Sequence, residues 1–347
     1  MKATKFSRFS ISGRNAAGIG KILRTISLIL IMIFITSSYR DNSFMLVLLP
    51  DTQSYSSNFP DIFNSQTSWI AEKADEITFV LHQGDITNDN IEKEWIVATD
   101  ALEKMDGKVP YTFVPGNHDM GENGKAETRN TDLFNQFLPF NKYSSLRTFG
   151  GAFETGKMDN TYHTFRAGGR KWLILSLEFG PRNSVLEWAG SVIEDHPRHK
   201  VIINTHAYMY SDETRMSAER DHKWLPQNYG LGKASGADSV NDGEAMWEKL
   251  LGKYKNVMLV FSGHVLNDGA GTLVSTGING NKVYQMLANY QGGVIGSENG
   301  GNGFLRMVTI NPKANSISVR SYSPSLDQFK TDEEHEFTFE DVEFLRR

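Results

Sequence analysis

Five apolar runs in this sequence are each followed closely by a side chain that can bind a metal. These side chains are Asp51, Asp85, Asn117, His206 and His264. Two carboxylates, an amide oxygen and two imidazoles suit divalent metals that take mixed oxygen and nitrogen ligands. A single Asp or His at the end of a strand is commonly structural, but five such residues in corresponding positions predict one shared metal site.

The fragment Gly116-Asn117-His118-Asp119 adds two groups that can move or orient a proton. The His118 imidazole titrates near neutral pH and can act as a general acid. Asp119 supplies a carboxylate that can fix the orientation of that imidazole. The fragment alone would fit a polar turn after a strand. Beside the predicted metal ligands, it is interpreted as a catalytic pair of His118 and Asp119.

Short apolar runs alternate with amphipathic segments through most of the chain. The expected strands are 45–49, 77–81, 111–114, 171–178, 201–203 and 257–261, and the expected helices are 61–74, 91–105, 184–193 and 244–251. Ser184, with Glu187 three residues later, has the pattern of a helix-capping box. The alternation predicts an α/β sheet, in which the carboxyl ends of the strands gather along one edge where ligands bind.

The pattern changes beyond Asn267 to short alternating segments with Gly and Asn turns, which predict an antiparallel meander. Its expected strands are 272–275, 282–287, 304–310 and 316–322. Gly292–Gly303 precedes a strand rather than a helix, so it is interpreted as a hairpin loop and not as a phosphate-binding loop. Residues 119–160 and 207–242 are predicted to be long irregular loops. We expect a single mixed α/β (α+β) domain over residues 41–347.

Residues 1–40 differ from the rest of the chain. They contain seven basic residues and no acidic one, and Ile26–Ile35 is almost wholly apolar. A basic start, a short apolar run and small residues after it are typical of a secretory signal peptide. The run is short for a membrane span, which needs about 20 apolar residues. We expect export to a periplasmic, extracellular or membrane-anchored location, with an uncleaved N-terminal anchor or a buried core segment as alternatives.

Composition and charge restrict the possible partners. The chain lacks cysteine, which excludes disulfides, thiolate ligands and a cysteine nucleophile. Without residues 1–40 the chain has 29 basic residues against 41 acidic ones, a net charge of −12. Nucleic-acid binding needs a basic footprint, so nucleic acid is an unlikely partner. A small phosphorylated substrate held by local metal charge is compatible with this balance.

The ordered motifs resemble those of the calcineurin-like metallophosphoesterases. The resemblance is carried by Asp51-Thr52-Gln53, Gly84-Asp85 with Asn88, Gly116-Asn117-His118-Asp119, Thr205-His206 and Gly263-His264. It runs from about Met45 to Leu266 and agrees in order, spacing and strand context. It implies a β-sandwich flanked by helices, with the C-terminal meander as the second sheet.

The resemblance also implies a role for each motif residue. Asp85 would bridge two divalent metals, chosen from Mn, Fe, Zn or Mg. Asn117, His206 and His264 would complete one metal shell, and Asp51 would hold the other metal. His118 would protonate the leaving oxygen while a metal-bound hydroxide attacks phosphorus in line. The expected function is an exported phosphoesterase that hydrolyses a phosphomonoester or phosphodiester.

Two positions depart from the family pattern. The family usually has His where this chain has Gln53, and a second His where it has Leu266. Both belong to the metal held by Asp51, so we expect an asymmetric centre in which the Gln53 carbonyl is a candidate ligand. Asn267 or Asp268 could replace the missing group. A hydrolase with one metal, or a binding protein of the same fold without turnover, therefore remains an alternative.

Few other residues carry a signal for substrate recognition. Asn88 and Tyr208 are the candidates for substrate binding, because each directly follows a predicted ligand motif. His82 is expected to be a structural histidine at a strand end. The predicted substrate loops contain no motif that identifies the phosphate ester, and the oligomeric state is also left open.

Overall fold

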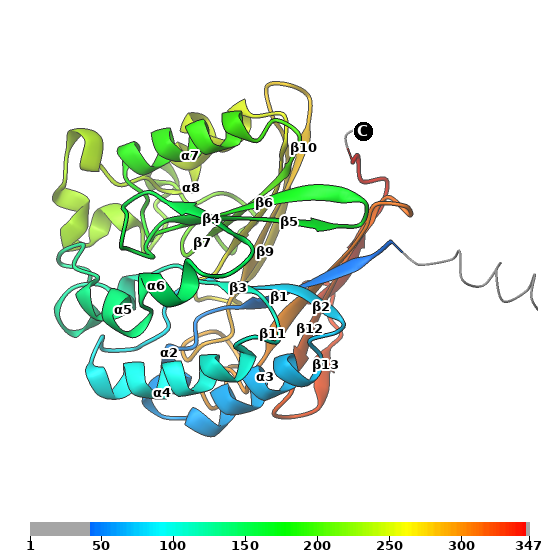
Figure 1. Cartoon of the computed structure of the whole chain (residues 1–347). Coiled ribbons are helices and arrows are strands. Elements are labelled where there is room, and N and C mark those ends of the chain that lie inside the picture. The colour runs from blue at the N-terminus through cyan, green and yellow to red at the C-terminus, as the bar shows by residue number, and fades with distance from the viewer. Residues whose placement is uncertain (1–41, 345–347) are drawn as a thin grey trace, which may run out of the picture. The chain divides into compact units, whose positions relative to one another are not determined.

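Two β-sheets packed face to face form the centre of the molecule (Figure 1). The computed structural model describes residues 42–344. In this part of the chain, the first sheet has the order β13-β12-β11-β1-β2-β3, with β14 paired to β12. Its strands are β1 (Phe44–Leu49), β2 (Ile77–His82), β3 (Tyr111–Thr112), β11 (Leu305–Asn311), β12 (Ser316–Ser323), β13 (Gln328–Lys330) and β14 (Glu336–Phe339).

The second sheet has the order β4-β5-β6-β7-β8-β10-β9 within the same described residues. Its strands are β4 (Phe149–Ala152), β5 (Thr161–Ala167), β6 (Arg170–Leu177), β7 (Lys200–Thr205), β8 (Val257–Ser262), β9 (Ala270–Thr276) and β10 (Lys282–Ala288). The neighbours β6, β7, β8 and β10 are parallel, as are β1, β2 and β3 in the first sheet. Parallel strands bring their carboxyl ends to a common edge.

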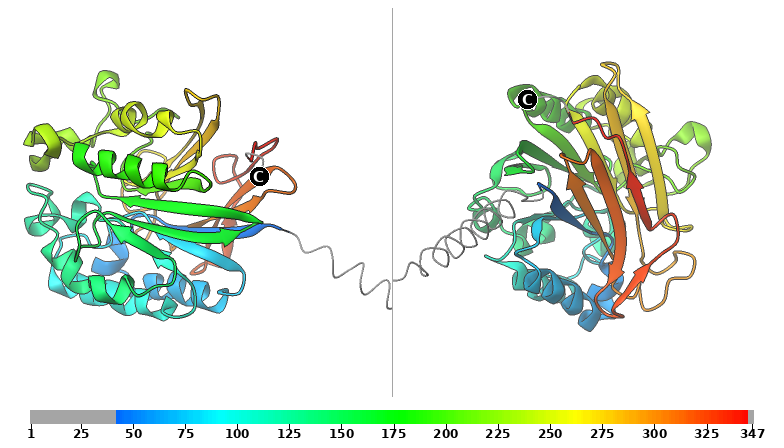
Figure 2. Two further views of the ribbon diagram at one scale, coloured as in Figure 1. Left: turned by 45° about the horizontal axis from the view of Figure 1, so that its top comes forward. Right: turned by 90° about the vertical axis from the view of Figure 1, so that its right-hand side faces the viewer.

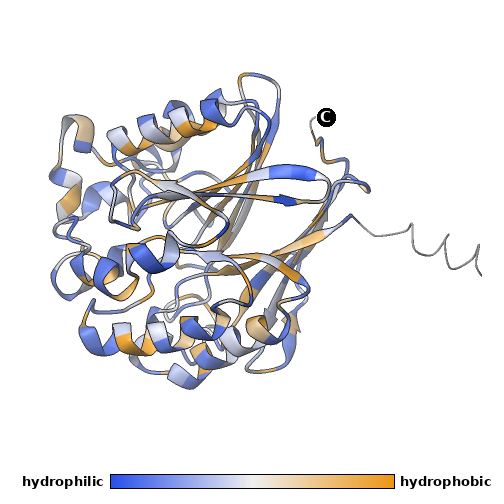
Figure 3. Ribbon diagram, viewed as in Figure 1, coloured by the Kyte–Doolittle hydropathy of each residue, from blue (hydrophilic) through white to orange (hydrophobic). Residues whose placement is uncertain are grey.

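Helices cover the outer face of each sheet (Figure 2). They are α2 (Gln53–Ser57), α3 (Pro60–Glu72), α4 (Glu92–Leu102), α5 (Asp132–Phe137), α6 (Phe140–Tyr143), α7 (Asn183–Asp195) and α8 (Gly243–Lys249). Trp95 of α4 packs with Val47 of the first sheet, and Leu186 of α7 packs with Leu175 of the second. Figure 3 shows hydrophobic residues along the strands and both kinds of residue on the helices.

A third hydrophobic cluster lies between the sheets. It combines Leu46 and Phe79 of the first sheet with Trp172 and Phe261 of the second, all fully buried. Alternate residues of a strand point to opposite faces, so β1 contributes Leu46 to this cluster and Val47 to the cluster under the helices. The predicted β-sandwich flanked by helices is confirmed.

Some predicted elements are wrong in detail. Strand β4 lies in the stretch 119–160 that was expected to be irregular. Strand β5 was not predicted, because its inward side chains include Thr161 and His163 rather than a plain apolar alternation. Helix α7 begins at Asn183 with Arg182 as N-cap, and Ser184 does not cap it. The antiparallel C-terminal half is confirmed, but it does not form one sheet: β9 and β10 extend the second sheet, whereas β11 and β12 complete the first.

The predicted signal peptide or anchor in residues 1–40 lies outside the described residues. Among residues 42–344, no helix has the length and apolar character needed to cross a membrane. From Asn42 onward the chain forms one compact unit.

Candidate metal centre

The predicted ligands follow the parallel strands, and three of them have unusual backbone conformations. Asp51 after β1, Asp85 after β2 and His264 after β8 have φ angles of 38°, 49° and 74°. Residues other than glycine rarely adopt positive φ, and such strain is typical of functional sites. The backbone turns sharply at each strand end and directs the ligand groups toward the other sheet.

Glycines beside these ligands allow close approach. A Cβ atom at Gly116 would lie 2.1 Å from Oδ1 of Asp85, and one at Gly263 would lie 2.1 Å from Oδ2 of Asp51. Each carboxylate therefore occupies the space that a side chain would take. This explains why glycine stands at both positions of the sequence motifs.

His206 and His264 direct one ring nitrogen of each toward a common point. Nδ1–H of His206 donates to the Gln83 carbonyl at 2.8 Å, and Nε2–H of His264 donates to the Trp224 carbonyl at 2.7 Å. The opposite nitrogens, Nε2 of His206 and Nδ1 of His264, are 3.0 Å apart. Metal-binding histidines are commonly fixed by such second hydrogen bonds, which set the tautomer.

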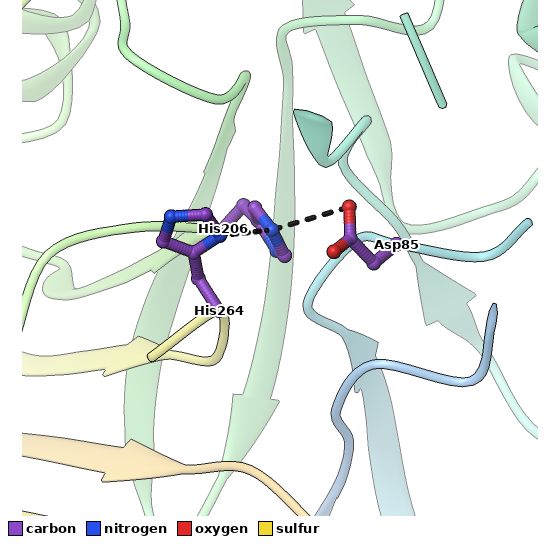
Figure 4. A group of neighbouring side chains, drawn as sticks. All are labelled: Asp85, His206 and His264. Carbon is purple, nitrogen blue, oxygen red and sulfur yellow. Dashed lines mark hydrogen bonds and ion pairs between the residues drawn. The ribbon is translucent and has the colours of Figure 1, made fainter. Parts of the chain in front are cut away.

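Asp85 and Asn117 complete this cluster; Figure 4 shows Asp85 with the two histidines. Nε2 of His206 lies 3.2 Å from Oδ1 of Asp85 and 3.1 Å from Oδ1 of Asn117. One ligand atom from each of Asp85, His206 and His264 lies within 4.8 Å of the others. Two imidazole nitrogens, a carboxylate and an amide oxygen fit a divalent cation of intermediate hardness. We call these four residues the histidine half of the centre.

Electrostatic coupling in the histidine half is strong because its groups are buried. Burial disfavours the charged form of His206, yet the Asp85 carboxylate raises the pKa of His206 to about 9. Burial likewise opposes ionisation of Asp85, but the charges of His206 and His118 hold its pKa well below the usual range. Burial and the neighbouring His206 charge lower the pKa of His264 to about 3. In the protein without metal, His206 therefore carries a second ring proton, on Nε2, beside its Nδ1–H.

The other side of the centre is organised differently. Nε2–H of Gln53 donates to Oδ2 of Asp85 at 3.2 Å and also to Oε1 of Gln291, while Nε2–H of Gln291 donates to Oδ1 of Asp51 at 3.1 Å. Burial raises the pKa of Asp51 well above its usual value, with the Asp85 charge adding to the effect. We call Asp51, Gln53 and Gln291 the amide half of the centre.

The amide half offers a second metal fewer ligands than the family pattern would. In their present orientation its two amides direct N–H groups at the carboxylates, whereas a metal would need their oxygens. Leu266, at the family position of the second histidine, lies against Gly293, since a Cβ there would be 3.2 Å from its Cδ1. Asn267 donates to Ser211, Asp268 accepts from Ala270, and both side chains are exposed. Oε1 of Gln53 is buried without a hydrogen-bond partner among the described residues.

Gln291 is the functional residue that the sequence interpretation missed. It follows β10, which is parallel to β8, so it reaches the same edge as the predicted ligands. The segment after it is not a hairpin loop. It crosses from the second sheet to the first and packs on α2, where a Cβ at Gly300 would be 2.4 Å from Cβ of Ser54. The sequence signal for Gln291 was that it is a polar residue shortly after a sixth strand, β10.

His118 lies beside the histidine half and is partly exposed. Its backbone N–H donates to Oδ1 of Asp85 at 2.9 Å, which links it to a metal ligand. Its Nδ1–H donates to the backbone carbonyl of Asn88 at 2.6 Å. Because a carbonyl only accepts, this contact fixes the tautomer and leaves Nε2 for a substrate. Asn88 thus positions His118 through its backbone, whereas its side chain bonds to Asp89.

The predicted pairing of Asp119 with the His118 ring is wrong. The Asp119 carboxylate is fully buried and accepts from the backbone N–H groups of Gly116, Ile86 and Thr87, and from the Thr87 hydroxyl. Burial, followed by repulsion from Asp85, raises the pKa of Asp119 to about 6 against these hydrogen bonds. Asp119 ties together the turns after β2 and β3, so it is a positioning residue.

Two further residues belong to the protein interior rather than to a substrate surface. Tyr208, predicted to touch substrate, is fully buried in the core under α7 and donates its hydroxyl to Gln285 at 2.6 Å. The prediction for Tyr208 is therefore wrong. His82 lies 2.9 Å from the Thr52 hydroxyl and accepts the Gly84 N–H, as a structural histidine would.

Comparison with known proteins places these observations in a family. Residues 45–268 match the calcineurin-like phosphoesterase family. The chain belongs to this family. The matched stretch includes every predicted ligand from Asp51 to His264, so the resemblance seen in the motifs is confirmed.

Known relatives are distant. Uncharacterized protein YvnB of Bacillus subtilis (strain 168) is 25% identical over 295 residues, which are 81% of this chain and 20% of that protein, so the chain spans about a fifth of its length. Purple acid phosphatase PPD1 from yellow lupin (Lupinus luteus) has 14% identity and a TM-score of 0.50, over 86% of this chain and 54% of that one. This likeness supports the fold alone.

GAP50, the anchor in the inner membrane complex of Plasmodium, has 13% identity and a TM-score of 0.47. It covers 86% of this chain and 88% of that one. At this level the likeness carries no argument about the present chain.

Proposed function

We propose that this protein is a metal-dependent hydrolase of phosphomonoesters or phosphodiesters that works with one tightly held divalent cation. The observation that carries the proposal is the histidine half of the centre. Nε2 of His206, Nδ1 of His264 and a carboxylate oxygen of Asp85 meet within 4.8 Å, and both rings are fixed by backbone carbonyls. Oδ1 of Asn117 faces the same point.

The metal and His118 would divide the chemistry. When bound, a cation such as Mn, Fe or Zn would supply Lewis-acid stabilisation to the phosphoryl group and acidify a water molecule. His118 would donate a proton from Nε2 to the leaving oxygen while Asn88 holds its Nδ1–H. The hydrogen bond from the His118 backbone N–H to Asp85 fixes the position of the proton donor relative to this metal ligand. The Asp119 carboxylate accepts hydrogen bonds from the turns after β2 and β3 and so holds them together.

The amide half supports the proposal of a single strong metal site. In a two-metal centre, the carboxylates of Asp51 and Asp85 would face a second cation. Here, N–H groups of Gln291 and Gln53 approach these carboxylates at 3.1 and 3.2 Å. The amides stabilise the two buried charges without a cation, because hydrogen bonds to a charged group are the stronger ones.

The substrate class and location are also part of the proposal. The buried, polar centre suits a small phosphate ester, and the net charge of −12 outside residues 1–40 disfavours a long polyanion there. Export, to a periplasmic, extracellular or membrane-anchored location, is inferred from the basic and apolar pattern of residues 1–40.

A paired assay tests the function. Chromogenic phosphomonoesters and phosphodiesters would be offered to the purified protein with Mn, Mg, Zn or Fe. We expect turnover with at least one metal, and His118→Ala should lower kcat by roughly 10²–10⁴ while metal content is unchanged. Asn88→Ala keeps the carbonyl that fixes His118, so it measures separately what the Asn88 side chain contributes to substrate binding. Metal binding without turnover in any assay would point instead to a binding protein of this fold.

A further inference from the structure

A basic pocket lies at the sheet edge opposite the metal centre. It has a volume of about 500 Å³ and is lined by Arg166, Arg170, Lys171, Arg198, Lys200 and Lys255, with no acidic residue among its lining. Strands β6 and β7 begin at Arg170 and Lys200, whereas the centre follows the other end of β7. A six-residue strand spans about 20 Å, so pocket and centre are separate sites.

Three segments distant in sequence build this pocket. The β5–β6 hairpin contributes Arg166 and Lys171, the loop after α7 contributes Arg198, and the approach to β8 contributes Lys255. Nδ2–H of Asn256 donates to the carbonyls of His196 and His199 at 3.4 and 3.1 Å, which joins the second segment to the third. The basic groups are therefore held together by the fold.

Most charges of the pocket have no carboxylate partner within residues 42–344. Apart from Arg170, none of its basic side chains forms an ion pair with a carboxylate in the part of the chain that the structure describes. Arg166 and Lys171 stand directly opposite each other on neighbouring strands, an arrangement that destabilises a sheet when charges are alike. In a domain of net charge −12, such a concentration needs a compensating ligand.

Lys200 is the strongest indication of that ligand. Its side chain lines the pocket, it is 7% exposed, and no hydrogen bond or ion pair of its ammonium occurs within residues 42–344. The ammonium faces the pocket rather than a partner in the protein, so an anion that enters the pocket can pair with it. Burial, together with the charge of Arg170, lowers the pKa of Lys200 to about 8, and burial and nearby cations lower that of His199 to about 4.

We propose that this basic pocket binds the phosphate groups of an anionic ligand, with Lys200 as the central contact. Phosphate oxygens accept several charge-assisted hydrogen bonds at once, which matches a pocket rich in Arg and Lys. The ligand is either a soluble oligophosphate or the headgroup of an anionic phospholipid. The chain enters the domain at this edge, since a Cβ at Gly168 of the β5–β6 turn would lie 3.0 Å from the Asn42 carbonyl.

Binding to two probes tests the proposal on the full chain. Inorganic pyrophosphate would be titrated calorimetrically, and vesicles of phosphatidylcholine, with and without phosphatidylglycerol, would be used in flotation. Lys200→Met keeps the apolar stem and removes the charge, and the exposed pair Arg198→Gln with Lys255→Gln covers the case that Lys200→Met does not fold. The matched control is Lys93→Gln, which removes an exposed charge on α4.

We expect wild type and Lys93→Gln to bind one of the probes, and the pocket variants to bind it roughly tenfold to a hundredfold more weakly. The probe should also raise the Tm of wild type and leave that of Lys200→Met nearly unchanged. Response to pyrophosphate identifies a soluble ligand, and response to phosphatidylglycerol vesicles alone identifies a lipid. Binding of neither probe, or equal binding by Lys200→Met and Lys93→Gln, would overturn the proposal. The titrations are done without added metal and with a chelator, so that the metal centre does not contribute to pyrophosphate binding.

Discussion

The two halves of the metal centre are built on the same kind of strand end, but they surround its carboxylate with different groups. Each takes a buried carboxylate with a positive φ angle from the end of a parallel strand, Asp85 for the histidine half and Asp51 for the amide half. Around Asp85, imidazole nitrogens and an amide oxygen converge, and all can bind a metal once His206 has released its Nε2 proton. Around Asp51, the Gln291 amide and the His264 backbone N–H converge as donors. We expect the first set to bind a cation and the second to take the place of one.

Under the proposed function, this family site has lost one metal without losing its fold. A buried carboxylate needs either a cation or several hydrogen-bond donors. Gln53 and Gln291 supply donors at the place where the family usually has a histidine-bound metal. The same substitution is absent from the histidine half, where His206 and His264 keep their backbone anchors. Catalysis is therefore expected to depend on one half and stability on both.

The largest effect is expected from His206→Ala. This change removes the central ligand of the histidine half, which contacts Asp85, Asn117 and His264. Turnover should fall to background and bound metal should be lost, since no other nitrogen can take the place of Nε2. Metal analysis and the ester assay measure both. Gln53→Ala, the matched change in the amide half, should leave metal content near the wild-type level. Equal metal loss in the two variants would contradict the proposed difference between the two halves.

The pH dependence of metal binding should come from the histidine half alone. His206 has a pKa of about 9 without metal, so below that pH a cation must displace its proton. The apparent affinity should then rise about tenfold per pH unit up to about pH 9. Calorimetry in buffers of different ionisation enthalpy would count one released proton. A flat affinity between pH 6.5 and this value of about 9 would contradict the assignment of His206.

Restoring histidines should convert the amide half into a metal site. The double variant Gln53→His with Leu266→His supplies the two imidazoles that the family pattern places there. Wild type should hold one tight ion, and the double variant should hold a second, which metal analysis after gel filtration would detect. Leu266→His alone is the control, because Gln53 then still donates to Asp85. An unchanged ion count in the double variant would show that the amides are not what excludes the second ion.

The smallest effect is expected from Gln291→Ala. Oδ1 of Asp51 would lose one donor in a buried site, at a cost of about 1–3 kcal/mol in the free energy of unfolding. Urea denaturation without metal measures this cost. Gln227→Ala is the matched control, since Gln227 also donates to a carboxylate, Asp242, but is exposed. A surface change of this kind should cost less than about 0.5 kcal/mol. Similar losses in both variants would refute a stabilising role for the amide half.

Local sequence was enough to locate most of the centre. Asp51, Asp85, Asn117, His206 and His264 each follow an apolar run, and parallel strands necessarily bring such positions to one edge. His118 could be assigned because it adjoins a ligand. What spacing could not give was the direction of each side chain after a sharp turn. Asp119 is adjacent to His118, yet its carboxylate faces the turn after β2.

Long-range pairing explains the other errors. Gln291 reaches the centre only because β10 pairs with β8, a contact that no local pattern predicts. The same pairing divides the expected meander between two sheets. Tyr208 is two residues beyond His206, where the chain has turned back into the core. Strand β5 was missed because His163 and Thr161 occupy its buried positions in place of aliphatic residues.

The most direct test is a crystal structure of the protein loaded with Mn or Zn, with anomalous scattering used to count and identify ions. The account predicts one ion per chain, bound by Nε2 of His206 and Nδ1 of His264 with Asp85 and Asn117. The contact between Gln53 and Gln291 should be preserved. Two ions of equal occupancy, with Gln53 turned to bind the second through Oε1, would contradict it.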